Sequence, residues 1–171
     1  SVPAYKIASF EITDIPLIEY IASKGKPVII STGIATIEDI ELALDACKRM
    51  NNYQIALLKC TSSYPAPVEE ANLSMIKDIS NRFGVITGLS DHTLGATVPI
   101  AATALGAKII EKHFILDRSI GGPDSTFSMN EPEFTNMVKA IRETEKALGK
   151  IDYHLTDKQK NFVNTMKAQS N

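Results

Sequence analysis

Five short apolar runs, separated by amphipathic stretches, set the pattern of hydrophobic and polar positions along the chain. They lie at Ala4–Ala8, Pro27–Thr32, Ile55–Cys60, Val85–Ser90 and Ala107–Phe114. The runs start roughly 20 to 30 residues apart, which is the usual length of one βα unit. Their nearly continuous hydrophobicity is typical of parallel strands in a sheet that is covered on both faces. The pattern therefore predicts an α/β fold with five parallel strands.

The stretches between the runs carry helix signals, with capping residues at their starts and an apolar stripe along one face. Helices are predicted at Asp14–Ser23, from near Thr36, at about Glu69–Arg82, at Ala96–Leu105 and at Glu131–Leu148. We expect Ile37 and Leu148 on the buried faces of the second and the last of these helices. The polar tail, residues 150–171, is interpreted as a linker or an isolated helix.

Two architectures fit this alternation of strands and helices: an open doubly wound sheet, or part of a (β/α)8 barrel. No Gly-x-Gly-x-x-Gly motif follows the first strand, which counts against a dinucleotide-binding sheet. Five strands are too few for a closed barrel, so the barrel interpretation places about three more strands before this segment. Residues 1–149 are then the C-terminal part of a (β/α)8 TIM barrel, about five βα units that carry the catalytic face. Residues 150–171 are the polar tail that follows this segment.

Composition and charge narrow the range of functions. Hydrophobic residues make up 44% of the chain, so we expect it to bury a core. The formal net charge of −2 gives no electrostatic reason to expect nucleic acid or an anionic membrane as a partner. No apolar run reaches about 18 residues, so no membrane span is expected. The two cysteines, Cys47 and Cys60, are too few for a disulfide framework, and a cytoplasmic location is expected.

Polar side chains gather where the predicted strands end. They are Lys6, Ser9 and Glu11 at the first strand, Ser31, Thr32 and Gly33 at the second, Lys59, Cys60, Thr61 and Tyr64 at the third, Ser90, Asp91, His92 and Thr93 at the fourth, and Glu111, Lys112 and His113 on the fifth. In parallel α/β folds the C-terminal ends of the strands form the face on which active sites are built. The sequence therefore predicts a polar site at this face.

His92 and His113 lie at the ends of consecutive predicted strands, which are about 4.8 Å apart in a sheet. Two imidazoles at that spacing can reach one metal ion. With water completing the shell, they suit Mn²⁺, or a similar ion such as Mg²⁺ or Co²⁺, better than a closed structural zinc site. The alternative is two unrelated, hydrogen-bonded histidines. If the strands are regular there, strand alternation turns Asp91 and Glu111 to the side opposite the histidines. They then either act as hydrogen-bond partners of the ligands or point elsewhere.

A cation and three hydroxyl groups form a second candidate cluster. Lys6, Ser9, Ser31 and Ser90 can bind a phosphate together with backbone N–H groups. Each serine alone can equally begin a turn or cap a helix. Glu11 is a candidate general base or a partner for a substrate hydroxyl, and the alternative is an ordinary surface carboxylate.

The longest predicted loop, Ile115–Met129, contains the run Ile120–Asp124, which reads IGGPD. Loops of this length in compact domains are usually functional or mobile. Asp124 can bind sugar hydroxyls, or it can form only an Asx turn.

Six ordered motifs resemble the sialic acid synthase family. They are YKIAS-x-E, ISTG, LLKCTSSYPAP, GLSDHT, IEKHF and GGPD-x-x-FSM, and they span about Tyr5–Gly149. The forms SFEITDIPLIEY and IGGPDSTFSM are most similar to the pseudaminic acid synthase branch. The resemblance implies a metal-dependent transferase that condenses phosphoenolpyruvate with the open-chain aldehyde of an N-acetylated amino sugar. The implied products are a nine-carbon α-keto acid and phosphate, and N-acetylneuraminate or legionaminic acid synthesis remains an alternative to pseudaminic acid.

The resemblance also implies a role for each matching residue. The metal ligands correspond to His92 and His113, the phosphoenolpyruvate contacts to Lys6, Ser9, Ser31 and Ser90, the sugar-binding positions to Tyr64 and Asp124, and the acidic group near the reacting carbons to Glu11. Lys6 and Glu11 are expected to take part in catalysis. Members of the family carry further strands before this segment and a C-terminal antifreeze-like domain. The resemblance implies that residues 150–171 begin the linker to that domain and that the full-length protein is a homodimer.

Two rival interpretations come from other classes. Lys59 can be the nucleophile of a Schiff-base aldolase if it is desolvated, although His92 and His113 would then have no role. The segment can also be a truncated, non-catalytic module that keeps only the binding face.

Overall fold

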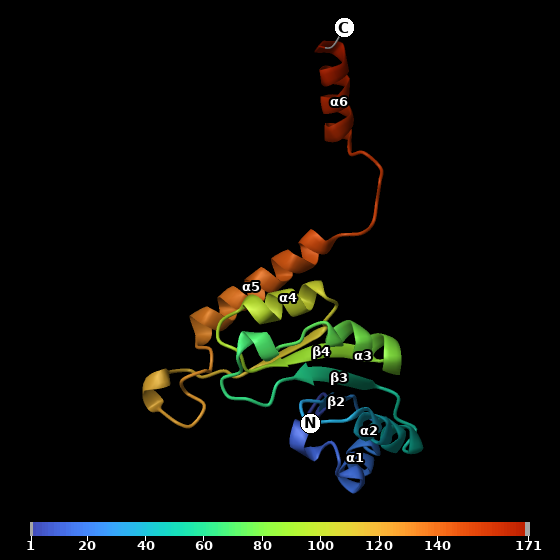
Figure 1. Ribbon diagram of the computed structural model, residues 1–171, viewed down its shortest axis with the longest axis vertical. Coiled ribbons are helices and arrows are strands. Elements are labelled where there is room, and N and C mark those ends of the chain that lie inside the picture. Colours follow the sequence, from blue (N-terminus) through green and yellow to red (C-terminus); the bar gives the residue numbers. More distant parts are fainter. Residues whose placement is uncertain (1, 170–171) are drawn as a thin grey trace.

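Five parallel strands lie side by side in the order in which they occur along the chain, β1-β2-β3-β4-β5 (Figure 1). The structure is a computed structural model, and it describes residues 2–169. The strands are β1 (Tyr5–Ile7), β2 (Val28–Ser31), β3 (Ile55–Cys60), β4 (Ile86–Asp91) and β5 (Ile109–Lys112). The predicted α/β fold class is confirmed, and the curved sheet is half of a (β/α)8 barrel.

Helices follow the strands in alternation. They are α1 (Ile15–Ala22), α2 (Ile37–Arg49), α3 (Met75–Phe83), α4 (Thr97–Ala104), α5 (Glu131–Leu148) and α6 (Asp157–Gln169), with short 3-10 helices at Ser9–Glu11, Val68–Glu70 and Arg118–Ile120. Right-handed crossovers between sequential strands bring successive helices to the same face of the sheet. Accordingly α1 packs against α2, and α4 packs against α5.

Strand alternation divides the sheet residues into two sets. One set faces the helices and forms the main core, where Ile7, Ile30 and Leu57 are fully buried. The other set faces the concave side of the half-barrel, where the apolar Ile86 is 56% exposed. A hollow of about 420 Å³ lies on this side, at the N-terminal ends of the central strands, and its lining is mostly apolar.

The structure corrects three details of the helix predictions. The helix predicted from Glu69 begins only at Met75, because Asn72 adopts a left-handed backbone conformation that interrupts it. Ile37 and Leu148 were predicted to be buried, but they are 48% and 53% exposed. Each lies in the terminal turn of its helix, so the apolar stripe continues beyond the surface that covers it.

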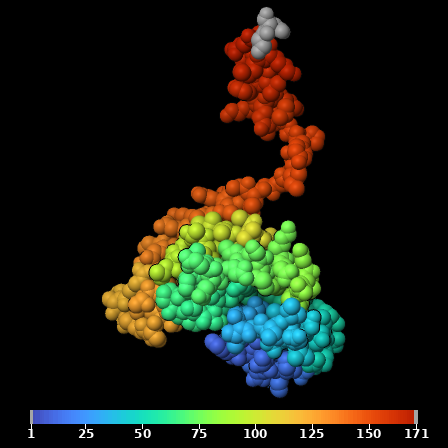
Figure 2. Space-filling view, viewed as in Figure 1, coloured from blue at the N-terminus to red at the C-terminus, as the bar shows by residue number. Residues whose placement is uncertain are grey.

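The polar tail contains the helix α6, in agreement with one of the two interpretations of this segment. It follows an extended stretch after Gly149, and it stands clear of the rest of the molecule (Figure 2). Among the described residues, no helix combines the length and the apolar character that a membrane crossing needs.

Close packing at Gly88 gives a first testable prediction. A Cβ atom at this position in β4 would overlap the backbone oxygen of Ile109 in β5 and would lie 2.7 Å from a methyl group of Leu58. We expect Gly88→Ala to lower the free energy of unfolding of the complete protein by about 3 kcal/mol, since the β5 backbone must move. Chemical denaturation measures this loss. Gly84→Ala, which meets no atom within 4 Å, adds only the strain of a left-handed residue, about 1 kcal/mol. Equal losses in both variants would contradict the packing argument.

Candidate functional site

A pocket of about 160 Å³ lies at the C-terminal ends of the strands, and all five strands or the loops that follow them contribute to it. Its lining is Lys6, Ala8, Ser9, Phe10, Ser31, Cys60, Tyr64, Ser90, His92, Glu111 and His113. The structure therefore brings together all the residues to which the family resemblance assigns a role, except Glu11 and Asp124. The convergence follows from the parallel sheet, because the same end of every strand points to one face.

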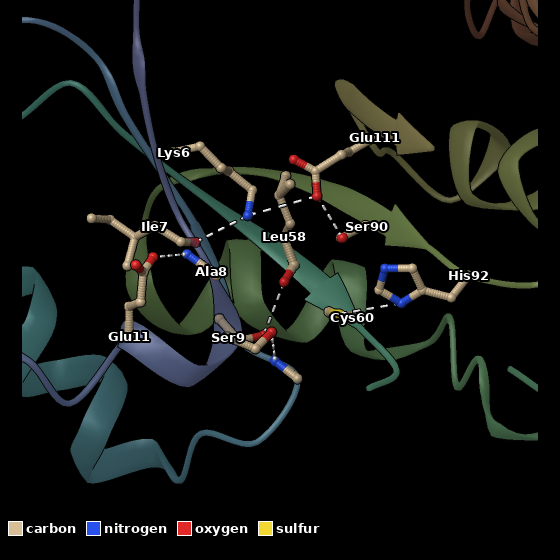
Figure 3. Close-up of polar contacts among 12 residues, drawn as sticks. Lys6, Ile7, Ala8, Ser9, Glu11, Leu58, Cys60, Ser90, His92 and Glu111 are labelled. Atoms are coloured by element: carbon tan, nitrogen blue, oxygen red, sulfur yellow. Dashed lines mark hydrogen bonds and ion pairs between the residues drawn. The ribbon is translucent and has the colours of Figure 1, made fainter. Parts of the chain in front are cut away.

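Lys6 and Glu111 face each other across the pocket (Figure 3). The Nζ atom of Lys6 lies 3.6 Å from an oxygen of Glu111 and donates a hydrogen bond to the backbone oxygen of Ile7. The same oxygen of Glu111 accepts a hydrogen bond of 2.6 Å from Ser90. The ammonium group of Lys6 and the hydroxyl of Ser90 therefore both point at one position, which a carboxylate oxygen of Glu111 occupies here.

The serine side of the pocket is tightly built. The Oγ atom of Ser9 accepts a hydrogen bond of 3.0 Å from the backbone N–H of Gly33. A Cβ atom at Gly33 would overlap the hydroxyl oxygen of Ser62 and would lie 2.9 Å from that of Ser9 and 3.1 Å from the sulfur of Cys60, so any larger residue would displace these side chains. The hydroxyl of Ser31 is buried and has no hydrogen-bond partner among the described residues. Such a hydroxyl is costly unless a ligand satisfies it.

The orientation of His92 is fixed by its Nδ1 atom, which lies 2.8 Å from the backbone oxygen of Thr61. A carbonyl oxygen only accepts hydrogen bonds, so Nδ1 carries the proton and Nε2 of the neutral ring keeps a free lone pair. Burial lowers the pKa of His92, but its contacts with Cys60 and Thr61 outweigh that effect and hold the pKa above the ordinary value. The free nitrogen is the atom that can ligate a metal.

His113 lies beside His92, with ring centroids 5.2 Å apart. Its Nδ1 atom is 3.5 Å from a carboxylate oxygen of Asp124. Burial, together with the neighbouring His92, lowers the pKa of His113 below its ordinary value. The neutral, ligating form of this ring is therefore favoured, and a carboxylate near the other ring nitrogen is the usual second partner of a metal-bound histidine.

The described residues contain no group of three or more histidine, cysteine or acidic side chains arranged to hold a metal ion. The donor set still fits a divalent ion of the Mn²⁺ type. Two imidazoles with free lone pairs leave the other coordination positions for water, for substrate, or for residues elsewhere in the complete protein.

An aromatic wall closes one side of the histidine pair. The ring centroids of Tyr64 and His92 are 4.3 Å apart, and those of Phe127 and His113 are 5.1 Å apart. Phe127 is buried and was not identified from the sequence. Its position in the FSM run of the long loop gave no chemical signal, because its contact with His113 depends on how that loop folds back.

Glu11 and Asp124 lie outside the pocket lining. An oxygen of Glu11 accepts a hydrogen bond of 2.8 Å from the backbone N–H of Ala8, which turns the carboxylate back onto its own 3-10 turn (Figure 3). Asp124 is 56% exposed and reaches the site only through His113. The roles predicted for these two carboxylates remain predictions.

The orientation predicted for Glu111 is wrong. Residues two apart on a strand face the same side, so Glu111 shares the pocket with His113 rather than turning away from it. Asp91, which directly precedes His92, does point away from the pocket. The signal that could have placed Glu111 in the pocket is its spacing of two residues from His113.

Cys60 also lines the pocket, as its place at the end of the third strand predicted, although the sequence assigned it no role there. Its sulfur lies 3.9 Å from Nδ1 of His92 (Figure 3). Burial raises the pKa of this thiol, but hydrogen bonds with His92, Ser9 and Ser90 outweigh burial and bring the pKa to about 7. A cysteine at the end of an apolar strand looks like an ordinary core residue in the sequence.

Lys59 does not line the pocket. Its Nζ atom donates a hydrogen bond of 2.9 Å to the backbone oxygen of Cys60 and contacts the hydroxyl of Thr61 at 3.3 Å. Burial lowers the pKa of Lys59, but the amine does not face the histidines or the serines. This position disfavours the Schiff-base alternative.

Known proteins that resemble the chain cover it almost completely. The NeuB family model matches residues 1–153. Pseudaminic acid synthase of Helicobacter pylori is 51% identical over 156 residues, which cover 91% of this chain and 46% of that protein. N,N'-diacetyllegionaminic acid synthase of Legionella pneumophila is 42% identical over 149 residues, which cover 84% of this chain and 42% of that protein. The chain thus spans about half the length of the curated relatives it matches.

Among solved structures, a similar one is N-acetylneuraminic acid (sialic acid) synthetase from Leptospira borgpetersenii, crystallised in complex with citrate. It superposes with a TM-score of 0.88 at 34% sequence identity. The match covers 98% of this chain and 58% of that structure.

Proposed function

The chain belongs to the NeuB family, and on that premise we propose that the complete protein is a phosphoenolpyruvate-condensing synthase of sialic-type acids. The methylene carbon of phosphoenolpyruvate bonds to the aldehyde carbon of an open-chain N-acetylated amino sugar, water adds at the neighbouring carbon, and phosphate leaves. The observation that carries the proposal is the pocket at the strand ends, which combines a cation, three serines and two histidines.

The cation and the serines bind phosphoenolpyruvate in this proposal. Its phosphate and carboxylate need positive charge and hydrogen-bond donors, which Lys6 and the hydroxyls of Ser9, Ser31 and Ser90 supply. The unpartnered hydroxyl of Ser31 supports the assignment, because a ligand oxygen there satisfies a buried group that otherwise has no partner.

The histidines hold the metal in this proposal. His92 and His113 each offer one ring nitrogen, and Mn²⁺ is the favoured ion. When bound, a divalent ion supplies Lewis-acid polarisation of the aldehyde oxygen. The protein's part is to orient the two rings, through the Thr61 backbone oxygen and the Asp124 carboxylate.

Tyr64 and Asp124 are the proposed sugar contacts, at the side of the histidine pair that opens to solvent. Both side chains are about half exposed and present an aromatic face and a carboxylate, which suit a sugar ring and its hydroxyls. Relatives named pseudaminic acid synthases support pseudaminic acid as the product.

Two carboxylates are candidates for moving protons near the reacting carbons. Glu11 matches the family's acidic position, although its carboxylate here bonds to the backbone of its own turn. Glu111 already lies in the pocket, between Lys6 and Ser90. We assign Glu11 the predicted role and add Glu111 as a second candidate general acid or base.

The proposal extends to the organisation of the complete protein. Residues 1–149 form the C-terminal part of the catalytic barrel, and residues 150–171, which include α6, begin a linker to a further domain. The exposed apolar Ile86 on the concave face supports a complete barrel, because further strands would cover it. The working form is proposed to be a homodimer.

Phosphate release from phosphoenolpyruvate tests the function. The complete protein is incubated with Mn²⁺ and one of three sugars: the 2,4-diacetamido-trideoxy hexose precursor of pseudaminic acid, the legionaminic acid precursor, or N-acetylmannosamine. We expect release with the first sugar only. Release with another sugar keeps the synthase and changes the product, whereas a folded, metal-bound protein that releases none contradicts the proposal.

The aldolase alternative is tested in the same preparation. Borohydride reduction in the presence of pyruvate traps a Schiff base on the reacting lysine. We expect no adduct on Lys59, because its amine faces the backbone oxygen of Cys60. An adduct on Lys59 would contradict the metal-dependent synthase and favour the Schiff-base aldolase.

A further inference from the structure

A buried ion pair lies directly behind the histidine pair, on the helix side of the sheet. The Nζ atom of Lys112 is 2.6 Å from a carboxylate oxygen of Asp91, and the two side chains are only 1% and 2% exposed. Neither residue lines the pocket. A buried ion pair is costly to desolvate and often adds little to stability compared with apolar residues of the same size. Its presence behind the site therefore points to a role other than stabilisation.

The position of the pair in the sheet connects it to both histidines. Asp91 and Lys112 are directly opposite each other in the register of β4 and β5, each in the last position of its strand. His92 follows Asp91, and His113 follows Lys112. The side chains alternate across the sheet, so the ion pair joins the strands on one face while the histidines meet on the other.

The hydrogen bonds of the pair also tie down the loop after His92. The ammonium group of Lys112 donates to Asp91, to the backbone oxygen of Thr93 and, at 2.9 Å, to the backbone oxygen of Gly95. The other carboxylate oxygen of Asp91 accepts from the N–H and the hydroxyl of Thr93, at 3.0 and 2.9 Å. His92 is thus held between two residues that are both bound to the neighbouring strand.

We propose that Asp91 and Lys112 are positioning residues that set the separation and orientation of His92 and His113 for a shared metal ion. This role rests on the proposed metal site. The pair touches neither substrate nor metal. It acts by locking the ends of β4 and β5 together, and a small change in that register moves one imidazole relative to the other.

Metal binding by variants of the complete protein tests the proposal. Lys112→Met is expected to weaken Mn²⁺ binding, measured by electron paramagnetic resonance, by about 10 to 100-fold, the range typical of replacing residues that orient metal ligands. A double variant, Asp91→Leu with Lys112→Met, replaces the pair by apolar side chains of similar volume and is expected to regain thermal stability. The Mn²⁺ affinity of the double variant is expected to stay low. If the ion pair only stabilised the fold, the double variant would regain Mn²⁺ affinity together with thermal stability.

The exposed pair of Asp78 and Arg82 on α3 offers a matched control. These side chains are 3.3 Å apart and about half exposed, so the same double replacement there, Asp78→Leu with Arg82→Met, is expected to leave Mn²⁺ affinity unchanged. If the Lys112 variants do not fold, Asp91→Asn keeps the shape of the side chain and removes its charge, and it is expected to weaken Mn²⁺ binding in the same range.

Two results would overturn the positioning role. If a folded Asp91 or Lys112 variant binds Mn²⁺ as tightly as the natural protein, the positioning role is wrong, while the proposed synthase function still stands. A natural protein that releases phosphate from phosphoenolpyruvate without binding Mn²⁺ removes the metal site, and the positioning role with it.

Discussion

Replacing His92 with alanine is expected to lower kcat of the complete protein by about a thousandfold. The reason is that a Lewis-acid metal supplies several kcal/mol of transition-state stabilisation, and about 4 kcal/mol corresponds to three powers of ten in rate. The backbone oxygen of Thr61 already fixes the ring of His92 through Nδ1, so alanine removes an oriented ligand atom, Nε2. Phosphate release and Mn²⁺ binding, measured on the same preparation, should fall together.

The third histidine of the chain is the matched control. His154 lies before α6, its side chain is 96% exposed, and it bonds to Asp152 rather than to any pocket residue. His154→Ala is therefore expected to keep full turnover and full Mn²⁺ affinity. The metal assignment fails if the His92 variant is folded and keeps more than about a tenth of the natural kcat, because the loss is then less than about 1.4 kcal/mol.

The sheet was predictable because each strand is a continuous apolar run between polar or glycine-containing segments. The predicted Pro27–Thr32 and Ile55–Cys60 contain or equal the observed β2 and β3. The fifth run was predicted too long, since Ala107–Phe114 contains only the four residues of β5. Hydrophobicity marks which residues are buried, but strand pairing decides where the hydrogen-bonded ladder stops, and that pairing is not local information.

The site was predictable where its residues stand at strand ends, because a parallel sheet gathers those ends whatever the details of packing. Lys6, Ser31 and His92 belong to this group. The predictions that failed to place a residue in the pocket depend instead on the direction in which its side chain points. Glu11 stands two residues after a pocket serine, yet its turn draws the carboxylate back to Ala8.

The ion pair behind the site shows a further limit of reading the sequence. Asp91 and Lys112 are separated by 20 intervening positions, and nothing in either segment says that they are opposite each other. Only the register of β4 against β5 pairs them. Positioning contacts of this kind become visible once the strands are aligned.

Lys6→Met is the second replacement with a large expected effect. A hydrogen bond to a charged group contributes about 1.5 to 3 kcal/mol, so kcat/KM for phosphoenolpyruvate is expected to fall by roughly 10 to 100-fold. The loss should exceed that of a typical lysine replacement because Lys6 is the cation that lines the pocket, and its removal leaves Glu111 facing the anionic substrate alone. Steady-state kinetics with phosphoenolpyruvate as the varied substrate measures the effect.

The direction of the change separates substrate binding from metal binding. Within the part of the chain that the structure describes, the ammonium group of Lys6 contacts the backbone oxygen of Ile7 and the carboxylate of Glu111 rather than either histidine. Mn²⁺ affinity should therefore stay near the natural value while kcat/KM for phosphoenolpyruvate falls. Lys24→Met removes the same charge from the end of α1, where the ammonium group lies 3.8 Å from the ring of Tyr20, and it should leave both quantities unchanged. If Lys6→Met weakens Mn²⁺ binding as much as it lowers kcat/KM, Lys6 supports the histidine site rather than binding phosphoenolpyruvate. The assignment of separate parts of the pocket to phosphoenolpyruvate and to the metal is then wrong.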